Sequence, residues 1–249
     1  MAVKSSPRAG QGRGAEGPVL TIEGRDIPLR FKVHARARRI TLRVDAHGSA
    51  ITVTAPSRRA YGDALAFAER ERAWIARRLE RIGARILFVP GASFPLRGAQ
   101  TVIAAAPKES APVTFDEAAS LLLVSGRVEH ADRRVRDFLT ELARRDLKVR
   151  VGVHCAALSL HVPRLVVRDP KARWGSCSAN GPLSFSWRLI MAPEYVLDYV
   201  AAHEVAHLAE MNHGPRFHTL VKSLTPRVRC AEAWLKEKGH LLHRYGAAR

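Results

Sequence analysis

Two histidines and a glutamate are spaced as in a metal centre with an adjacent general base. His203 and His207 stand four residues apart in the run H-E-V-A-H, and Glu204 directly follows the first. On an α-helix this step brings both imidazoles to one face, about one turn apart, where they can bind one ion. The carboxylate of Glu204 then lies about 100° around the helix axis, where it can deprotonate a water on that ion. The alternative is a histidine pair with only a structural role.

The third ligand must come from farther along the chain, because a catalytic zinc site has three protein ligands and an open fourth position. We expect His213. A continuous helix would place its side chain about 80° from that of His203. The chain must therefore turn first, and Asn-His-Gly-Pro at residues 212–215 suits a break, because Asn and Gly tolerate left-handed backbone and Pro cannot continue a helix. Glu210 is the rival ligand, since it would lie about 20° from the face of His203, and it could instead orient a histidine.

This residue set predicts hydrolysis by a zinc-activated water. Glu204 would take a proton from the water and pass it to the leaving group. A second donor besides zinc is needed to stabilise the oxyanion, and the sequence does not choose among Tyr195, Tyr199, Arg188 and His218. The histidines could be oriented by Glu210, by Asp198 or by backbone carbonyls.

Three runs of sequence around this motif resemble the YgjP-like metallopeptidase family. They are R-W-G-S-C-S at residues 173–178, W-R-L-I-M-A-P at 187–193, and H-E-V-A-H-L-A-E-M-N-H-G-P-R-F at 203–217. The resemblance is dense from 168 to 224 and looser before that. The family is related to the SprT, Spartan and WLM zincins, whose third ligand comes from a similar H-G-P-x-F element. The resemblance implies a zincin fold, one bound zinc ion and a peptidase acting on polypeptides.

Strands are predicted through most of the first half of the chain. Near-alternating apolar residues predict hairpins over 19–33 and 40–55, and further hairpins between 88 and 124. A helix capped by Ser57 and running to about Ile82 lies between them, and a long helix begins near Val128 and ends by Leu160. After the metal motif, apolar residues at helical spacing predict helices over 217–224 and 228–238.

Two further strands, at 164–169 and 183–187, are predicted beside the helix of the metal motif. An extended substrate could pair with a free backbone edge there, although a purely structural hairpin explains the same pattern. The predicted fold class is α+β, with a zincin-like core and a β-hairpin-rich N-terminal half. We divide it into a disordered basic tail (1–17), a β-rich region with one helix (18–126) and a helical core carrying the H-E-x-x-H motif (127–249).

Composition limits the class of protein. A chain of 249 residues with 47% hydrophobic residues suits a soluble globular protein. The N-terminus lacks the apolar core of a signal peptide, and no run is long enough to cross a bilayer, so we expect a cytoplasmic protein without membrane contact. Three separated cysteines without a C-x-x-C pair are expected to be reduced. Cys177 is either a small half-buried residue in a tight turn or a thiol that lines the active cleft or serves as a nucleophile.

The net charge of +18 makes a polyanion a natural partner. The basic cluster at 34–43 could contact a phosphate backbone, or its side chains could form an ordinary solvated strand face. Two other functions therefore remain open. One is a nucleic-acid-associated binding protein with a non-catalytic metal site, although closed metal sites more often use paired cysteines. The other is a metal-dependent hydrolase of a non-peptide amide or ester.

Overall fold

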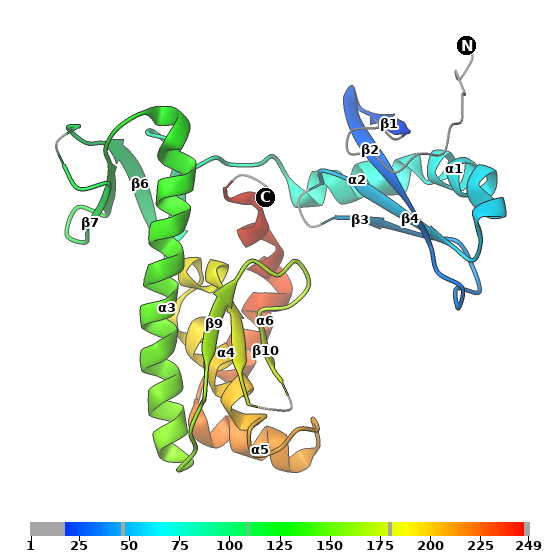
Figure 1. Cartoon of the computed structure of the whole chain (residues 1–249). Helices are drawn as coiled ribbons and strands as arrows, with labels where there is room; N and C mark the ends of the chain where they lie inside the picture. Colours follow the sequence, from blue (N-terminus) through cyan, green and yellow to red (C-terminus); the bar gives the residue numbers. More distant parts are fainter. Residues whose placement is uncertain (1–17, 46–47, 109, 179–180, 247–249) are drawn as a thin grey trace. The chain divides into compact units, whose positions relative to one another are not determined.

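The computed structural model describes residues 18–45, 48–108, 110–178 and 181–246, which Figure 1 colours along the chain. The chain divides into two compact units, Met1–Arg81 and Ile82–Arg249. Each unit combines helices and strands, so the α+β class is confirmed. The predicted tail at 1–17 lies outside the described residues. The division at 126/127, between a β-rich region and a helical core, stays a prediction.

The first unit is built on a four-stranded sheet with the order β1-β2-β4-β3. Its strands are β1 (Val19–Ile22), β2 (Arg25–Val33), β3 (Thr41–Val44) and β4 (Ile51–Ala55). Both predicted hairpins are confirmed, because β1 pairs antiparallel with β2 and β3 pairs antiparallel with β4. The turn between β1 and β2 uses Glu23 and Gly24 with φ of 48° and 75°. The parallel pairing of β2 with β4, which joins the two hairpins, was not predicted.

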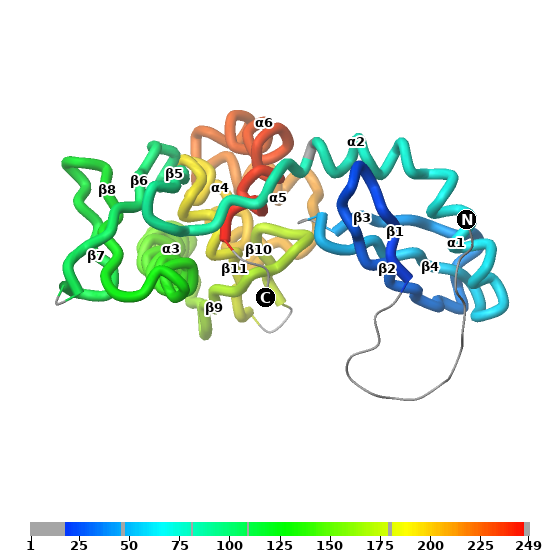
Figure 2. The backbone as a smooth tube through the Cα atoms, turned by 90° about the horizontal axis from the view of Figure 1, so that it is seen from above, coloured from blue at the N-terminus to red at the C-terminus, as the bar shows by residue number. Residues whose placement is uncertain are grey.

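One face of this sheet is covered by helices. After η1 (Arg58–Ala60) come α1 (Tyr61–Arg70) and α2 (Arg72–Ile82), so the single predicted helix is interrupted at Glu71. The side chain of Ser57 makes no capping hydrogen bond. Apolar residues of the strands and helices form the core of the unit, and Figure 2 shows α2 running along one side of the strands.

The second unit begins with a sheet that repeats the plan of the first. Its strands are β5 (Ser93–Leu96), β6 (Ala99–Ala105), β7 (Val113–Asp116) and β8 (Leu121–Val124). Their order is β5-β6-β8-β7, with two antiparallel hairpins joined by a parallel central pair. The first turn again holds a non-glycine and a glycine at positive φ, Arg97 at 50° and Gly98 at 85°. A short 3-10 helix and an α-helix again follow the fourth strand.

That helix is α3 (Ala131–Ala157), preceded by η2 (Val128–His130), and it confirms the long helix predicted from the sequence. Residues at four-residue spacing make a buried stripe along it: Val135, Leu139, Ala143, Leu147 and Val151. The stripe packs against the part of the chain that carries the metal motif.

A small three-stranded sheet lies beside the metal motif. It contains β9 (Leu165–Arg168), β10 (Gly175–Cys177) and β11 (Leu183–Ser186) in the order β10-β11-β9. The two predicted strands, β9 and β11, are present, but they are parallel and the hairpin reading was wrong. The connection between them contributes β10, an edge strand antiparallel to β11 that was not predicted.

The rest of the unit is helical. It consists of η3 (Trp187–Met191), α4 (Glu194–Ala206), α5 (Pro215–Leu224), α6 (Val228–Lys238) and η4 (Gly239–Arg244). Helix α4 is the central element, with nine buried residues, and it contacts α3, α5, α6 and β10 (Figure 1). Among the described residues, no helix has the length and apolar character needed to span a membrane.

Candidate metal centre

Three imidazoles converge at the C-terminal end of α4. His203, His207 and His213 each offer one ring nitrogen, and these atoms all lie within 4.8 Å of one another. The Nε2 atoms of His203 and His213 are 3.2 Å apart. Two nitrogens bound to one tetrahedral zinc at about 2.0–2.1 Å would be about 3.3 Å apart. The His203–His213 pair therefore has the spacing that one zinc ion requires, and Glu210, the rival of His213, is not part of the cluster.

Helix α4 ends before His213, which lets the chain turn so that His213 lies beside His203 and His207. His203 lies in the last turn, and His207 is the C-cap with φ −65° and ψ −18°. Leu208 and Ala209 then donate backbone hydrogen bonds to the carbonyls three residues earlier, which tightens and ends the helix. The helix therefore ends earlier than the sequence predicts, because it breaks at His207 and not at residues 212–215. Gly214 has ordinary extended backbone, with φ −82° and ψ −177°, so no left-handed residue is needed there.

The buried ring of Phe217 holds the three imidazoles together. It lies in the first turn of α5 and is 1% exposed. Its centroid is 4.9 Å from that of His203, 4.5 Å from that of His207 and 4.7 Å from that of His213. Sequence reasoning treated Phe217 only as one apolar position of an amphipathic helix. The run H-G-P-R-F, which places it four residues after His213, was the available signal.

The protonation of the cluster favours metal binding. Burial, followed by the neighbouring histidines, lowers the pKa of His203 to about 4, and burial lowers the pKa of His207. Both rings are therefore neutral near pH 7, as ligation requires. The Nδ1 of His207 lies 3.2 Å from the backbone oxygen of Glu210, so a proton on Nδ1 leaves Nε2 free for the metal. Glu210 thus orients a histidine through its backbone carbonyl.

The carboxylate of Glu204 lies against the edge strand β10. Glu204 is 6% exposed, and the backbone N–H of Cys177 donates a hydrogen bond to it. A Cβ added to Gly175 would come within 2.5 Å of Oε1 of Glu204. Burial raises the pKa of Glu204 to about 7, although the Cys177 N–H and the charge of Arg173 act in the opposite direction. A carboxyl group with such a pKa is suited to proton transfer near neutral pH.

The hydrogen-bonding pattern of β10 explains this contact. Trp174 accepts a ladder hydrogen bond from Ser186, and Ser178 donates one to Pro182. Because antiparallel ladders alternate, the backbone groups of Gly175 and Cys177 point away from β11. The free edge of β10 thus faces Glu204. Burial, and then the charge of Glu204, raises the pKa of the Cys177 thiol, which supports packing and not nucleophilic attack as its role.

Two of the four predicted oxyanion donors lie near the cluster. The ring of Tyr199 is 5.8 Å from that of His203, and its hydroxyl donates to Oε1 of Glu232 at 3.0 Å. Burial raises the pKa of Tyr199, so its hydroxyl keeps its proton. His218 is exposed on α5, with its ring 5.6 Å from that of Phe217. Both residues stay candidates, but Tyr199 can serve only if its single O–H turns from Glu232 to the oxyanion.

Arg188 has another role, which corrects its prediction as an oxyanion donor. Its guanidinium is fully buried and donates to both oxygens of Asp169, at 2.8 and 3.2 Å. It also donates to the carbonyls of Leu242 and Tyr245, at 2.8 and 2.7 Å. Four of its five N–H groups are used in this way. Arg188 therefore ties the C-terminal segment to the small sheet.

Tyr195 and Asp198 lie on a part of α4 that contacts α3 and not the histidine cluster. Asp198 is 3.0 Å from Nε2 of His154 on α3. Tyr195 lines a pocket with Asp198 and packs under the guanidinium of Arg227, 5.3 Å from its ring centroid. Neither contact reaches the metal ligands, so these two residues are weaker candidates than Tyr199.

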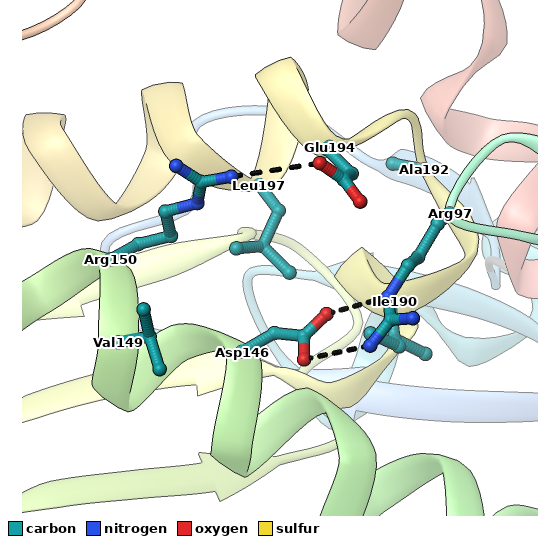
Figure 3. Close-up of a pocket in the computed structure, with 8 residues that line it drawn as sticks. All are labelled: Arg97, Asp146, Val149, Arg150, Ile190, Ala192, Glu194 and Leu197. Carbon is teal, nitrogen blue, oxygen red and sulfur yellow. Dashed lines mark hydrogen bonds and ion pairs between the residues drawn. The ribbon is translucent and has the colours of Figure 1, made fainter.

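A pocket of about 300 Å³ near the start of α4 is distinct from the metal centre (Figure 3). Its charges are paired with one another. Arg97 donates to both oxygens of Asp146, at 2.9 and 3.0 Å, and Arg150 lies 3.6 Å from Glu194. Because the charges balance, we interpret the pocket as an ion-paired junction of the β5–β6 turn, α3 and α4.

Comparison with known proteins finds one matching family model and, separately, two solved structures with low overall similarity. The family model described as "YgjP-like, metallopeptidase domain" matches residues 38–238. The crystal structure of the metallopeptidase zymogen abylysin from Pyrococcus abyssi is 19% identical, with a TM-score of 0.34, and the match covers 37% of this chain and 95% of that one. The zymogen jannalysin from Methanocaldococcus jannaschii is 23% identical, with a TM-score of 0.31, and the match covers 36% and 86%. No curated protein matches the chain.

Proposed function

This chain belongs to the YgjP-like metallopeptidase family, and from that membership we propose that it is a zinc peptidase with His203, His207 and His213 as ligands and Glu204 as general base. The observation that carries the proposal is the joint placement of three converging imidazoles and one buried carboxyl group of raised pKa. Structural metal sites do not need such a carboxyl group, whereas hydrolysis does.

The proposed mechanism assigns the proton transfers to Glu204. Zinc in a site of this kind acts as a Lewis acid and lowers the pKa of water in its open position to about 7. Glu204 accepts the proton of the attacking water and then gives it to the leaving nitrogen. The Cys177 N–H holds the carboxylate in position for both transfers, and Gly175 leaves room for it because it has no side chain. Tyr199 and His218 are the remaining candidates for a donor to the oxyanion.

A polypeptide is the proposed substrate. The family supports peptide hydrolysis, and the edge strand β10 offers backbone groups beside the proposed base. An extended chain can pair with such an edge whatever its side chains are. Only part of the edge is available, because the Cys177 N–H already donates to Glu204. Gly175 is therefore the residue whose backbone we expect a substrate to contact.

The decisive experiment compares Glu204→Gln with the unchanged protein. Purified, zinc-loaded protein is incubated with a mixture of denatured proteins, and both cleavage and zinc content are measured. We expect Glu204→Gln to keep its zinc and to lose at least about 100-fold in kcat, since general-base catalysis contributes about 10²–10⁴-fold. Glu237→Gln, at an exposed carboxylate of α6, is the matched control and should keep full activity.

Two results would reject the peptidase proposal. Cleavage that survives Glu204→Gln would remove the proposed base. Zinc binding without cleavage of any protein, in a chain that does hydrolyse simple esters or amides in a Glu204-dependent manner, would indicate a hydrolase of another class.

A further inference from the structure

The N-terminal sheet has one face that its helices do not cover. Ile27 and Leu29 of β2 are buried, and the ring of Phe31 packs edge-on against Tyr61 of α1, with centroids 5.1 Å apart. Alternate residues of a strand point to opposite faces. Arg30 and Lys32 therefore project from the face opposite the helices, and both are exposed.

The strand registers continue this outer face in two rows. Arg30 of β2 lies opposite Thr52 of β4, which lies opposite Arg43 of β3. In the next row Lys32 lies opposite Thr54, which lies opposite Thr41. Directly opposed residues share a face of the sheet. These two rows present three cations, Arg30, Lys32 and Arg43, separated by threonine hydroxyls, and we call these three residues the basic face. Asp26, two rows away on the same side of β2, accepts a hydrogen bond from Thr21 of β1 at 2.7 Å.

Positive charge is concentrated in the stretch of sequence that follows Asp26. From Ile27 to Val44 the sequence has six Lys or Arg and no Asp or Glu, and three of the six, Arg36, Arg38 and Arg39, lie exposed in the β2–β3 connection. From Tyr61 to Ile82, by contrast, the sequence has five Arg and four Asp or Glu. In the part of the chain that the structure describes, no ion pair joins a residue of the basic face to a carboxylate.

The repeated sheet of the second unit provides an internal comparison. The two sheets can be aligned by matching the last residue pair of each parallel ladder, Val33–Ala55 in the first and Ala105–Val124 in the second. In this alignment the positions of Arg30, Lys32 and Arg43 are occupied by Val102, Ala104 and Asp116. The same strand order in the same chain therefore carries no cation at these positions. Neither the fold nor the arginine-rich composition of the chain requires the basic face.

We propose that the basic face binds the phosphate backbone of double-stranded nucleic acid without reading its sequence. Arg30 and Arg43 are two strand spacings apart, about 10 Å, so their repulsion is only partly screened at a Debye length of about 8–10 Å. Phosphates relieve this repulsion, and hydroxyl groups between the cations are suitable donors to phosphate oxygens. The rows contain no aromatic side chain to stack on bases, as single-strand sites do, and no large apolar side chain to enter a membrane interface.

The test measures binding of a fluorescein-labelled 20-base-pair DNA duplex by the whole chain, using anisotropy at several salt concentrations. The test variant combines Arg30→Gln, Lys32→Gln and Arg43→Gln. The matched control combines Arg59→Gln, Arg77→Gln and Arg78→Gln, which removes the same charge from exposed positions in η1 and α2 of the same unit. Thermal melting shows whether each variant is folded.

We expect the basic-face variant to bind the duplex at least about tenfold more weakly in low salt, with a slope of log K against log salt reduced by about 3. The control variant should lose far less affinity for the duplex. A duplex of different sequence should compete equally with the labelled one. A variant with Arg30→Lys and Arg43→Lys should bind the duplex like the unchanged protein, since the charges remain. If the triple variant does not fold, Arg43→Gln alone should reduce the slope by about 1.

Three outcomes would overturn the proposal. An equal loss in the two triple variants would mean that net charge alone attracts the duplex. Tighter binding of single strands than of duplex would contradict the lack of stacking groups. Binding of phosphatidylserine vesicles with no binding of the duplex would assign the face to a membrane surface.

Discussion

At the scale of single residues, the clustering of the three histidines could be predicted because their spacing is local. His203, Glu204 and His207 follow from one helical repeat, and His213 follows from the need for a turn. Gly175 could not be given its role in this way, because its close approach to Glu204 exists only in the folded chain. For Phe217 the run H-G-P-R-F gave a signal, but its packing against all three imidazoles is seen only in the structure. Arg188 illustrates the converse, since a plausible catalytic residue type proves to be a buried structural tie.

Substitution of Gly175 tests the contact between β10 and Glu204. Gly175→Ala should push the carboxylate away, because its new Cβ would lie within 2.5 Å of Oε1. A displacement of about 1 Å can cost about 100-fold in rate. We therefore expect kcat to fall by about 10- to 100-fold while zinc content changes little. Ser176→Ala, whose side chain projects from the opposite face of the strand, is the control, and an equal loss there would contradict the prediction.

The pH dependence of activity should report Glu204. The carboxyl group must be ionised to accept a proton, so kcat/KM should decrease as the pH falls through its pKa. Burial raises that pKa to about 7 without metal, and a nearby dication favours the ionised form. The acid limb should therefore have an apparent pKa between about 4.3 and 7. Zinc content measured at each pH distinguishes this titration from loss of metal, and an acid limb that follows zinc release would argue against Glu204.

At the scale of elements, hairpins and helices were predictable and parallel pairings were not. Both hairpins of the first sheet and the long α3 follow from local apolar periodicity. The parallel pairs β2–β4, β6–β8 and β9–β11 join segments whose partners no local pattern specifies, and β10 is too short to give a periodic signal. The repeat of the four-stranded sheet could not be predicted, because the two sheets share a strand order and not a sequence pattern.

The junction around the β5–β6 turn should contribute to stability. Arg97 and Asp146 form a bidentate pair whose side chains are 29% and 24% exposed. Arg97→Ala should lower the free energy of unfolding by about 1–2 kcal/mol, since bidentate charge-assisted bonds are stronger than surface pairs. The control is Arg133→Ala, which breaks an exposed pair with Asp137 on α3. Chemical denaturation should show almost no change in the free energy of unfolding for Arg133→Ala. Equal losses in Arg97→Ala and Arg133→Ala would contradict the prediction that the junction contributes to stability.

At the scale of the whole molecule, metal binding should stabilise the second unit, which contains all three proposed ligands. Zinc at about 100 times its Kd adds about 2.7 kcal/mol to the free energy of unfolding. Calorimetry with and without a chelator should therefore show a zinc-dependent rise in Tm. His213→Ala should abolish most of this rise and Glu210→Ala should keep it, because Glu210 acts through its backbone carbonyl. The reverse result would make Glu210 the third ligand.

The groups of the proposed metal centre lie at different distances along the sequence. The three imidazoles come from 11 neighbouring residues, 203–213, whereas the groups that contact Glu204 come from a strand about 30 residues earlier. If the chain is the zinc peptidase proposed above, a short local segment suffices to capture the ion, whereas activity also needs β10 docked on α4. We therefore expect a newly made molecule to bind zinc before it is able to digest protein.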